Sequence, residues 1–280
     1  MRVFVVGATG VLGRQVLPRL VEHGHNVAAV ARHEADVARL QRLGIDAQRG
    51  DILAAESMRA AVRGCDAVLH LATAIPKAGP QMDWSLNDRI RREGTRNLLA
   101  VAQEEGVRRY VQQSITFLYG DTGDQLATEE YPLEARSRYA STFEMEEAVR
   151  ASSLEWVMLR GGWFYGPGTG REESWRREAG QGSLRLPEDG SALVSLIRVE
   201  DMARAVVLAA ESAPTGAIYN IVDDTPVRYR ELYHYLAAQL LAPEPPAGGP
   251  PVASLGCSNA AIRHALGWEP AWPSYRSGLA

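Results

Sequence analysis

The sequence predicts an α/β fold in which helices cover both faces of a parallel β-sheet. Over the first 160 residues, short apolar runs alternate with longer amphipathic stretches, which is typical of repeated strand–helix–strand units. The apolar runs are rich in valine and almost continuously apolar, as expected of strands that are covered on both faces. We therefore expect a doubly wound α/β domain over residues 1–160.

The expected elements follow one another in a regular order. Strands are expected at 3–6, 27–30, 46–48, 67–71, 109–113 and 156–159, and helices at 11–23, 35–43, 56–62, 86–105 and 139–151. From residue 161 onward, loops containing glycine, proline and tryptophan interrupt shorter elements, and the stretch 242–251 holds five prolines. We expect residues 161–280 to form mainly a smaller C-terminal substrate-binding lobe, with some segments returning to the main sheet.

Composition and charge exclude several classes of protein. The chain has 280 residues, 30 of them Lys or Arg and 34 Asp or Glu, so its formal charge of −4 carries no signature of nucleic-acid or anionic-membrane binding. The two cysteines, Cys65 and Cys257, make no disulfide framework, and the histidines show no metal-ligand spacing. The apolar start is too short for a signal peptide, and no window approaches the ~20 apolar residues of a membrane span. We expect a soluble, cytoplasmic protein without a metal.

A glycine-rich turn joins the first expected strand to the first expected helix. Its sequence is Gly7-Ala8-Thr9-Gly10-Val11-Leu12-Gly13. Glycines at such a turn allow a pyrophosphate to approach the backbone closely, and the helix N-terminus then favours the negative phosphates. The spacing G-x-x-G-x-x-G is not the usual G-x-G-x-x-G, and a tight structural turn without a ligand is the alternative. We predict a Rossmann-like domain whose cofactor contacts include Gly7, Thr9, Gly10, Val11, Leu12 and Gly13.

The residue after the second strand indicates which dinucleotide is bound. An acidic residue there would accept a hydrogen bond from the ribose of NAD, whereas an arginine would pair with the 2′-phosphate of NADP. The expected strand is followed by Arg32, and Arg14 stands on the first helical turn as a second phosphate partner. These residues favour NADP, with NAD as the alternative cofactor and two solvated arginines as the alternative interpretation.

With these motifs in place, the chain resembles the extended short-chain dehydrogenase/reductase family, of the NAD-dependent epimerase/dehydratase type. Besides the glycine turn, the matching segments are Gly50-Asp51-Ile52, His70-Leu71-Ala72-Thr73, Gly94-Thr95-Arg96-Asn97-Leu98-Leu99 and Leu159 to Gly168. The resemblance implies further cofactor contacts at Asp51, Ile52, Leu71, Ala72, Thr73, Gly162 and Trp163. It also implies a homodimer formed through the helices at 86–105 and 139–151.

The catalytic pattern of that family is incomplete in this chain. The family uses a tyrosine in Y-x-x-x-K and a preceding Ser or Thr, and the matching tyrosine here is Tyr139. Phe143 stands at the lysine position, and the hydroxyl position falls on Ile115. The flanking residues Ser114 and Thr116 would point to the opposite face of an extended strand. We expect Tyr139, Ser114 and Thr116 to be the catalytic residues, with a packing residue at the start of a helix as the alternative interpretation of Tyr139.

Other residues are weaker candidates for the site. Lys77 is the only lysine in the chain and would either replace the missing cation or be an ordinary solvated loop lysine. Trp163, Trp175, Trp84 and Met82 would suit a ring-containing substrate, although packing explains them equally well. Four arginines would suit an anionic group of the substrate, namely Arg171, Arg176, Arg177 and Arg198. The alternative interpretation is that these side chains are exposed or ion-paired.

We therefore expect an NADP(H)-dependent oxidoreductase or epimerase acting on a small carbonyl or sugar-like molecule. The alternative is a non-catalytic NADP(H)-binding protein with a redox-sensing or regulatory role. The absent lysine favours the binding protein, whereas the retained Tyr139 favours the enzyme.

Overall fold

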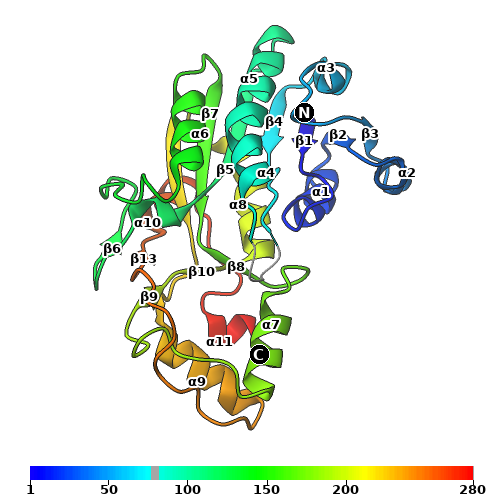
Figure 1. The fold of residues 1–280 in the computed structure, drawn as a ribbon. Coiled ribbons are helices and arrows are strands. Elements are labelled where there is room, and N and C mark those ends of the chain that lie inside the picture. The colour runs from blue at the N-terminus through cyan, green and yellow to red at the C-terminus, as the bar shows by residue number, and fades with distance from the viewer. Residues whose placement is uncertain (77–81, 280) are drawn as a thin grey trace. The chain divides into compact units, whose positions relative to one another are not determined.

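The computed structural model describes residues 1–76 and 82–279. It is built on a seven-stranded sheet with the order β11-β7-β5-β4-β1-β2-β3 (Figure 1). The pairings from β3 across to β5 are parallel. The strands are β1 (Arg2–Val6), β2 (Asn26–Ala31), β3 (Asp46–Arg49), β4 (Ala67–His70), β5 (Arg109–Ile115), β7 (Glu155–Gly161) and β11 (Ala217–Ile221). The predicted α/β class is confirmed.

Helices connect the strands and cover the sheet. They are α1 (Gly13–Glu22), α2 (Glu34–Arg42), α3 (Glu56–Val62), α5 (Thr95–Glu104), α6 (Ala140–Arg150) and α8 (Val199–Ser212). The helices α3, α5 and α6 pack side by side in that order. Glu211 of α8 accepts hydrogen bonds from His23 and His25, which follow the end of α1. From β1 the strand order runs to β2 and β3 in one direction and to β4, β5 and β7 in the other. Because crossovers between parallel strands are right-handed, α3, α5 and α6 lie on one face of the sheet, and α1 and α8 lie on the other.

The expected helix at 86–105 is one continuous helical stretch with a π-helical middle. It consists of α4 (Ser85–Arg89), the π-helix η1 (Ile90–Gly94) and α5. Gly94 ends the π-helix against Ile52, whose side-chain carbons would lie 3.1 Å from a Cβ added to the glycine. A π-helix widens the backbone locally and is frequent at functional sites. The expected helix is therefore present, and its π-helical centre is a feature that the sequence did not indicate.

The end of β5 also differs from the expectation. The strand ends at Ile115, and the next residues form the 3₁₀-helix η2 (Thr116–Tyr119). Ser114 and Thr116 therefore do not stand on one extended strand, as the sequence reasoning assumed. The turn of η2 sends the two hydroxyls to different surroundings.

The chain divides into two compact units. The first unit comprises Met1–Ser114, Arg136–Leu159 and Ala203–Ile218, and the second comprises Ile115–Ala135, Arg160–Met202 and Tyr219–Ala280. The second unit contains short strands and helices: β6 (Leu126–Ala127), β8 (Trp163–Tyr165), α7 (Arg171–Gly180), β9 (Leu193–Val194), β10 (Leu196–Arg198), β12 (Val227–Arg228), α9 (Tyr229–Gln239), β13 (Gly256–Cys257), α10 (Ala260–Leu266) and α11 (Tyr275–Gly278).

Each unit has its own apolar core. In the first unit, Phe4, Val68 and Leu98 are completely buried between the sheet and its helices. In the second unit, the core is richer in aromatic side chains, with Trp175 and Tyr233 packed among leucines of α9. Burial of apolar surface at about 25 cal/mol per Å² is the main force that holds each unit together. None of the helices within the described ranges is long and apolar enough to cross a membrane.

Candidate active site

The segments predicted to bind the dinucleotide emerge at one edge of the sheet. The strands β4, β1, β2 and β3 are neighbours and run parallel, and they end at His70, Val6, Ala31 and Arg49. The residues that follow each strand therefore lie along the same carboxyl edge. Ligands of open parallel α/β sheets bind at this edge.

The glycine turn has the geometry that a bound pyrophosphate requires. Gly7 follows β1 with φ +86°, and a Cβ there would lie 2.6 Å from backbone atoms of Leu71 and Ala72. A Cβ on Gly13 would lie 2.2 Å from the carbonyl oxygen of Gly7. Helix α1 therefore starts in contact with the turn, and no side chain caps its N-terminus at Leu12. The residues present fit a dinucleotide phosphate, because small residues and an open helix N-terminus meet there.

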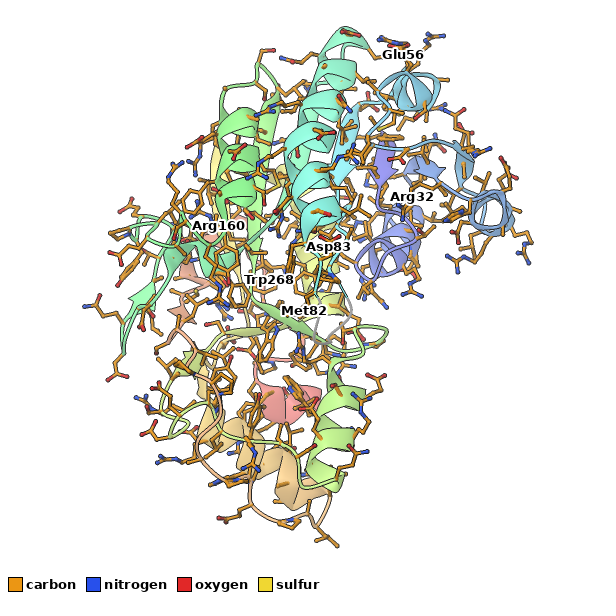
Figure 2. All side chains as sticks on the ribbon, viewed as in Figure 1. Arg32, Glu56, Met82, Asp83, Arg160 and Trp268 are labelled. Atoms are coloured by element: carbon orange, nitrogen blue, oxygen red, sulfur yellow. The ribbon has the colours of Figure 1, made fainter. Side chains whose placement is uncertain are left out.

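The other predicted cofactor residues of the first unit lie along the same edge. Arg32 directly follows β2 and is exposed (Figure 2). Arg14 is also exposed and donates from Nε to the carbonyl oxygen of Gly10 at 3.3 Å. Asp51 accepts a hydrogen bond from the backbone N–H of Leu53 at 2.9 Å, which shapes the turn after β3.

The remaining first-unit candidates differ in exposure, and the last two candidates belong to the second unit. Ile52 and Leu71 are buried, Ala72 and Thr9 are half-buried, and Thr73 is exposed. In the second unit, a Cβ on Gly162 would lie 2.6 Å from the carbonyl oxygen of Ser195. Trp163 packs there against Arg171, whose guanidinium carbon lies 4.0 Å from the indole ring centre.

Tyr139 stands immediately before α6 in the first unit. Its side chain is half-buried, and the guanidinium carbon of Arg138 lies 5.6 Å from its ring centre. Phe143 is one turn further along α6, where the resemblance places a lysine. Its ring is buried, with the guanidinium carbon of Arg136 4.7 Å from the ring centre. Arginine side chains thus stack on both rings at the start of α6.

The two predicted catalytic hydroxyls have partners in the structure. Ser114 is buried and donates its hydroxyl to the Glu146 carboxylate at 2.7 Å, two helical turns beyond Tyr139. Glu146 also accepts from Arg150 at 3.0 Å. Thr116 is buried in the second unit and donates to the carbonyl oxygen of Gly161 at 3.4 Å. Both hydroxyls therefore serve the packing of their own units.

A buried polar chain lies at the end of β4. His70 Nδ1 is 3.0 Å from the hydroxyl of Tyr110, which donates to Gln112 at 3.3 Å. Burial lowers the pKa of His70 to about 4, so the imidazole is neutral at neutral pH. The neighbouring Arg91 guanidinium lowers the His70 pKa further, although less than burial does.

Arg91 is the residue of this region that the sequence reasoning missed. It belongs to η1 and is only 8% exposed. Burial lowers its pKa, while the Asp88 carboxylate and the Tyr139 phenol raise it. One sequence signal was present: Asn87, Arg91 and Thr95 are polar residues spaced by four positions on a face that is otherwise apolar, and all three are buried.

The weaker candidates are distributed between the two units. Met82, labelled in Figure 2, is 51% exposed, and Trp84 is 41% exposed. In the second unit, the rings of Trp163 and Trp175 meet edge to face at 5.6 Å between centres. Lys77 lies outside the described residues.

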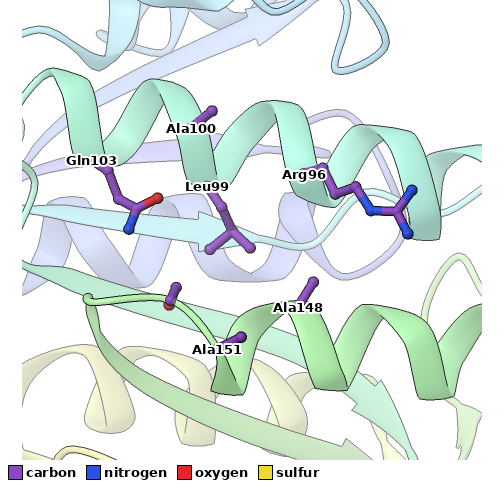
Figure 3. A pocket seen from close by; sticks show the side chains of 7 residues that line it. Arg96, Leu99, Ala100, Gln103, Ala148 and Ala151 are labelled. Atoms are coloured by element: carbon purple, nitrogen blue, oxygen red, sulfur yellow. The ribbon is translucent and has the colours of Figure 1, made fainter.

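A shallow groove lies between α5 and α6, on the first unit (Figure 3). None of the predicted cofactor or catalytic residues lines it. The lining residues are Arg96, Leu99, Ala100, Gln103, Ala148, Ala151 and Ser152. This groove is therefore separate from the candidate active site.

The fold and the strand-edge geometry define a nucleotide-binding protein of the Rossmann class. A model of the NAD(P)H-binding family matches residues 7–213, which include the glycine turn and most of the first unit. The chain belongs to this family.

Comparisons with individual proteins agree with that assignment. A 3-diazoavenalumate denitrifying reductase from Streptomyces sp. is 34% identical over 306 aligned positions, which cover 100% of this chain and 99% of that protein. A 2-alkyl-3-oxoalkanoate reductase from Stenotrophomonas maltophilia is 32% identical and covers 87% of this chain and 77% of its own.

A solved structure extends the comparison to the whole fold. The UDP-glucose 4-epimerase of Thermus thermophilus, in complex with NAD, has a TM-score of 0.82 at 24% identity. The alignment covers 100% of this chain and 96% of that chain. The family and these relatives indicate an enzyme of the pyridine-nucleotide oxidoreductase class.

Proposed function

We propose that the protein is an NADPH-dependent reductase of a small organic molecule, with Tyr139 as its general acid. The proposal is carried by one observation. The glycine turn and Arg32 follow neighbouring parallel strands at the carboxyl edge of the first unit, and the same unit presents Tyr139 at the start of α6. A nucleotide site and a proton donor are the two parts that such a reduction needs.

The chain's own residues would bind the cofactor through three contacts. The Gly7–Gly13 turn and the N-terminus of α1 would hold the pyrophosphate, and Arg32 would pair with the 2′-phosphate, assisted by Arg14. Asp51, Ile52 and the Leu71–Thr73 segment would border the adenosine, and Gly162 and Trp163 of the second unit would border the nicotinamide end. When bound, reduced nicotinamide supplies a hydride.

Tyr139 would protonate the substrate where negative charge develops. A neutral phenol is the correct form for a reduction, since the group must give a proton rather than take one. Ser114 and Thr116 are proposed as assisting hydroxyls with lower priority, because both donate to groups of their own unit. Lys77 stays a candidate cation for the site.

The relatives' names point to organic acids as substrates. The substrates named for the Streptomyces and Stenotrophomonas reductases are carboxylates. In the second unit, Arg171 is half-buried between Trp163 and Trp175, at 4.0 and 5.9 Å from their ring centres. An arginine stacked on aromatic rings suits the carboxylate of a ring-containing acid. We therefore include a small carbonyl-containing acid in the proposed substrate class.

Phe143 is the observation that favours the alternative, a non-catalytic NADP(H)-binding protein. The two functions are separated by measuring NADPH oxidation with a panel of small carbonyl and oxo-acid compounds. The reductase proposal predicts turnover that falls about 10²- to 10⁴-fold in Tyr139→Phe with unchanged NADPH affinity. Tight NADPH binding without turnover on any compound would favour the binding protein.

We further propose a homodimer formed through α5 and α6, as the family resemblance implies. Four of the seven residues that line the groove between these helices are small, among them Ala100 and Ala148, which would permit close approach of a second helix pair. Light scattering during gel filtration is expected to give the mass of a dimer, and the mass of a monomer in the double variant Ala100→Glu/Ala148→Glu. A monomeric native protein would refute this proposal.

A further inference from the structure

Arg91 is a buried cation in the first unit. It is only 8% exposed, and the charge of the Asp88 carboxylate acts on it. Burying a charge is costly unless an opposite charge or a hydrogen-bonding partner compensates it. The Asp88 carboxylate compensates this charge in part, and a phenolate formed at Tyr139 during the reaction would compensate it further.

The surroundings of Arg91 locate it at the start of α6. The π-helix η1 packs directly against α6, and Ser141 in the first turn of α6 donates to the Asp88 carboxylate at 2.6 Å. Asp88 and Tyr139 are the two groups whose charge acts on Arg91. The packing of η1 on α6 brings the segment that carries Arg91 against the helix that begins directly after Tyr139.

Buried polar atoms without partners surround the same segment. Within the described residues, Asn87 Nδ2 on α4, Thr95 Oγ1 on α5 and Thr142 Oγ1 on α6 form no hydrogen bond, and each of these residues is 0% exposed. His70 Nε2, at the end of β4, is also without a partner. Native proteins leave few buried polar groups unpaired, so this concentration marks a place where a ligand or solvent completes the bonding.

We infer that Arg91 supplies the positive charge that a lysine four residues after the tyrosine would otherwise provide, and thereby acts as the positioning residue for Tyr139. This inference rests on the proposed role of Tyr139 as the general acid. In the proton transfer, the phenolic O–H bond breaks, the proton passes to the substrate, and the bonding electrons remain on the phenolate. The Arg91 guanidinium stabilises that phenolate until a solvent proton restores the phenol.

An arginine is suited to supply a positive charge from a buried position. Its guanidinium stays charged even when it is buried, because its ordinary pKa lies above 12. Two other charged side chains belong to this region: Asp88, bonded to Ser141 in the first turn of α6, whose carboxylate opposes phenolate formation, and the exposed Arg138, which stacks on the Tyr139 ring. Of the two arginines, Arg91 is the buried one, so water screens its electrostatic effect on Tyr139 less than that of Arg138.

The test uses tyrosinate absorbance in the protein without cofactor, together with steady-state kinetics. The contribution of Tyr139 is the part of the absorbance change with pH that is lost in Tyr139→Phe. In Arg91→Met we expect this part to move to higher pH and kcat to fall about 100-fold, with NADPH affinity unchanged. Arg91→Lys should restore both readouts. Arg89→Met, which removes an exposed arginine paired with Glu93, should change neither.

Several results would overturn the inference. An unchanged tyrosinate titration in Arg91→Met would do so, as would an equal loss of kcat in the methionine and lysine variants. A raised KM with unchanged kcat would assign Arg91 to substrate binding instead. Arg91→Gln keeps a polar side chain and replaces the methionine variant if that one does not fold. Because the titration needs neither cofactor nor substrate, it tests Arg91 even if the proposed reductase activity is not found.

Discussion

Replacing Gly13 by alanine tests whether the glycine turn is a binding site. The added Cβ would lie 2.2 Å from the Gly7 carbonyl oxygen and 2.7 Å from that of Ala8. Carbon and oxygen in van der Waals contact are more than 3 Å apart, so the start of α1 must move by about 1 Å. Such overpacking costs about 1–3 kcal/mol of folding stability.

The same movement displaces the helix N-terminus from the phosphates. Losing one charge-assisted hydrogen bond to a phosphate removes about 1.5–3 kcal/mol of binding free energy, which corresponds to a roughly 10- to 100-fold higher dissociation constant. NADPH binding is measured by fluorescence titration, and folding stability by urea unfolding monitored with circular dichroism.

Gly24→Ala is the matched control, because Gly24 lies just beyond the other end of α1. Its φ is +77° and no atom lies within 4 Å of an added Cβ, so the variant carries backbone strain without a steric clash. The strain costs about 1–2 kcal/mol, and NADPH affinity should be unchanged. If Gly13→Ala binds NADPH as tightly as the native protein, the assignment of the turn to phosphate binding is refuted.

Three further predictions concern single side chains. Arg32→Ala should weaken NADPH binding at least about tenfold while NADH binding hardly changes; equal losses for both nucleotides would contradict its assignment to the 2′-phosphate. The lowered pKa of His70, about 4 against about 6.5 in the unfolded chain, predicts a pH-dependent stability. Between these values the unfolded chain binds more protons, so the free energy of unfolding should fall by about 3 kcal/mol as pH drops from 7 to 4. The variant His70→Gln should lose that part of the slope in urea titrations, and an unaltered slope would count against a buried neutral imidazole. Ser114→Ala removes the hydrogen bond to the buried Glu146 carboxylate and should cost about 1.5–3 kcal/mol in urea unfolding. A lowered kcat in the same variant would support the assisting role proposed for Ser114, whereas a kcat near the native value would assign its hydroxyl to packing alone.

The regular part of the fold could be predicted because its determinants are local. Valine-rich runs and amphipathic periodicity mark β1 to β5 and the helices between them, and the observed bounds differ from the predicted ones by a few residues. The glycine turn was likewise recognisable, since its position between a strand and a helix is a feature of the sequence itself.

The π-helix and the 3₁₀-helix could not be predicted in the same way. The π-helix Ile90–Gly94 ends at Gly94, which lies close to Ile52 in the turn that follows β3, a contact between segments distant in sequence. The end of β5 at Ile115 likewise depends on the tertiary position of η2. Neither local propensity nor periodicity records these contacts.

The partners of the site residues are non-local, which explains the differences at the site. Ser114 binds Glu146, 32 residues away, and Arg91 is one of many arginines in the chain until its burial is known. The sequence identified Tyr139 from its motif but could not identify the cation beside it, because Arg91 lies on a different helix. Site residues that belong to a local sequence motif could be predicted, whereas contacts between segments distant in the sequence could not.

The cofactor site is tested most directly by a fluorescence titration of the native protein with NADPH and NADH under identical conditions. The glycine turn and Arg32 predict binding of both nucleotides, with NADPH at least about tenfold tighter. Binding of neither nucleotide would contradict the account, because the turn would then be a structural feature only and the proposed reductase would lack its cofactor.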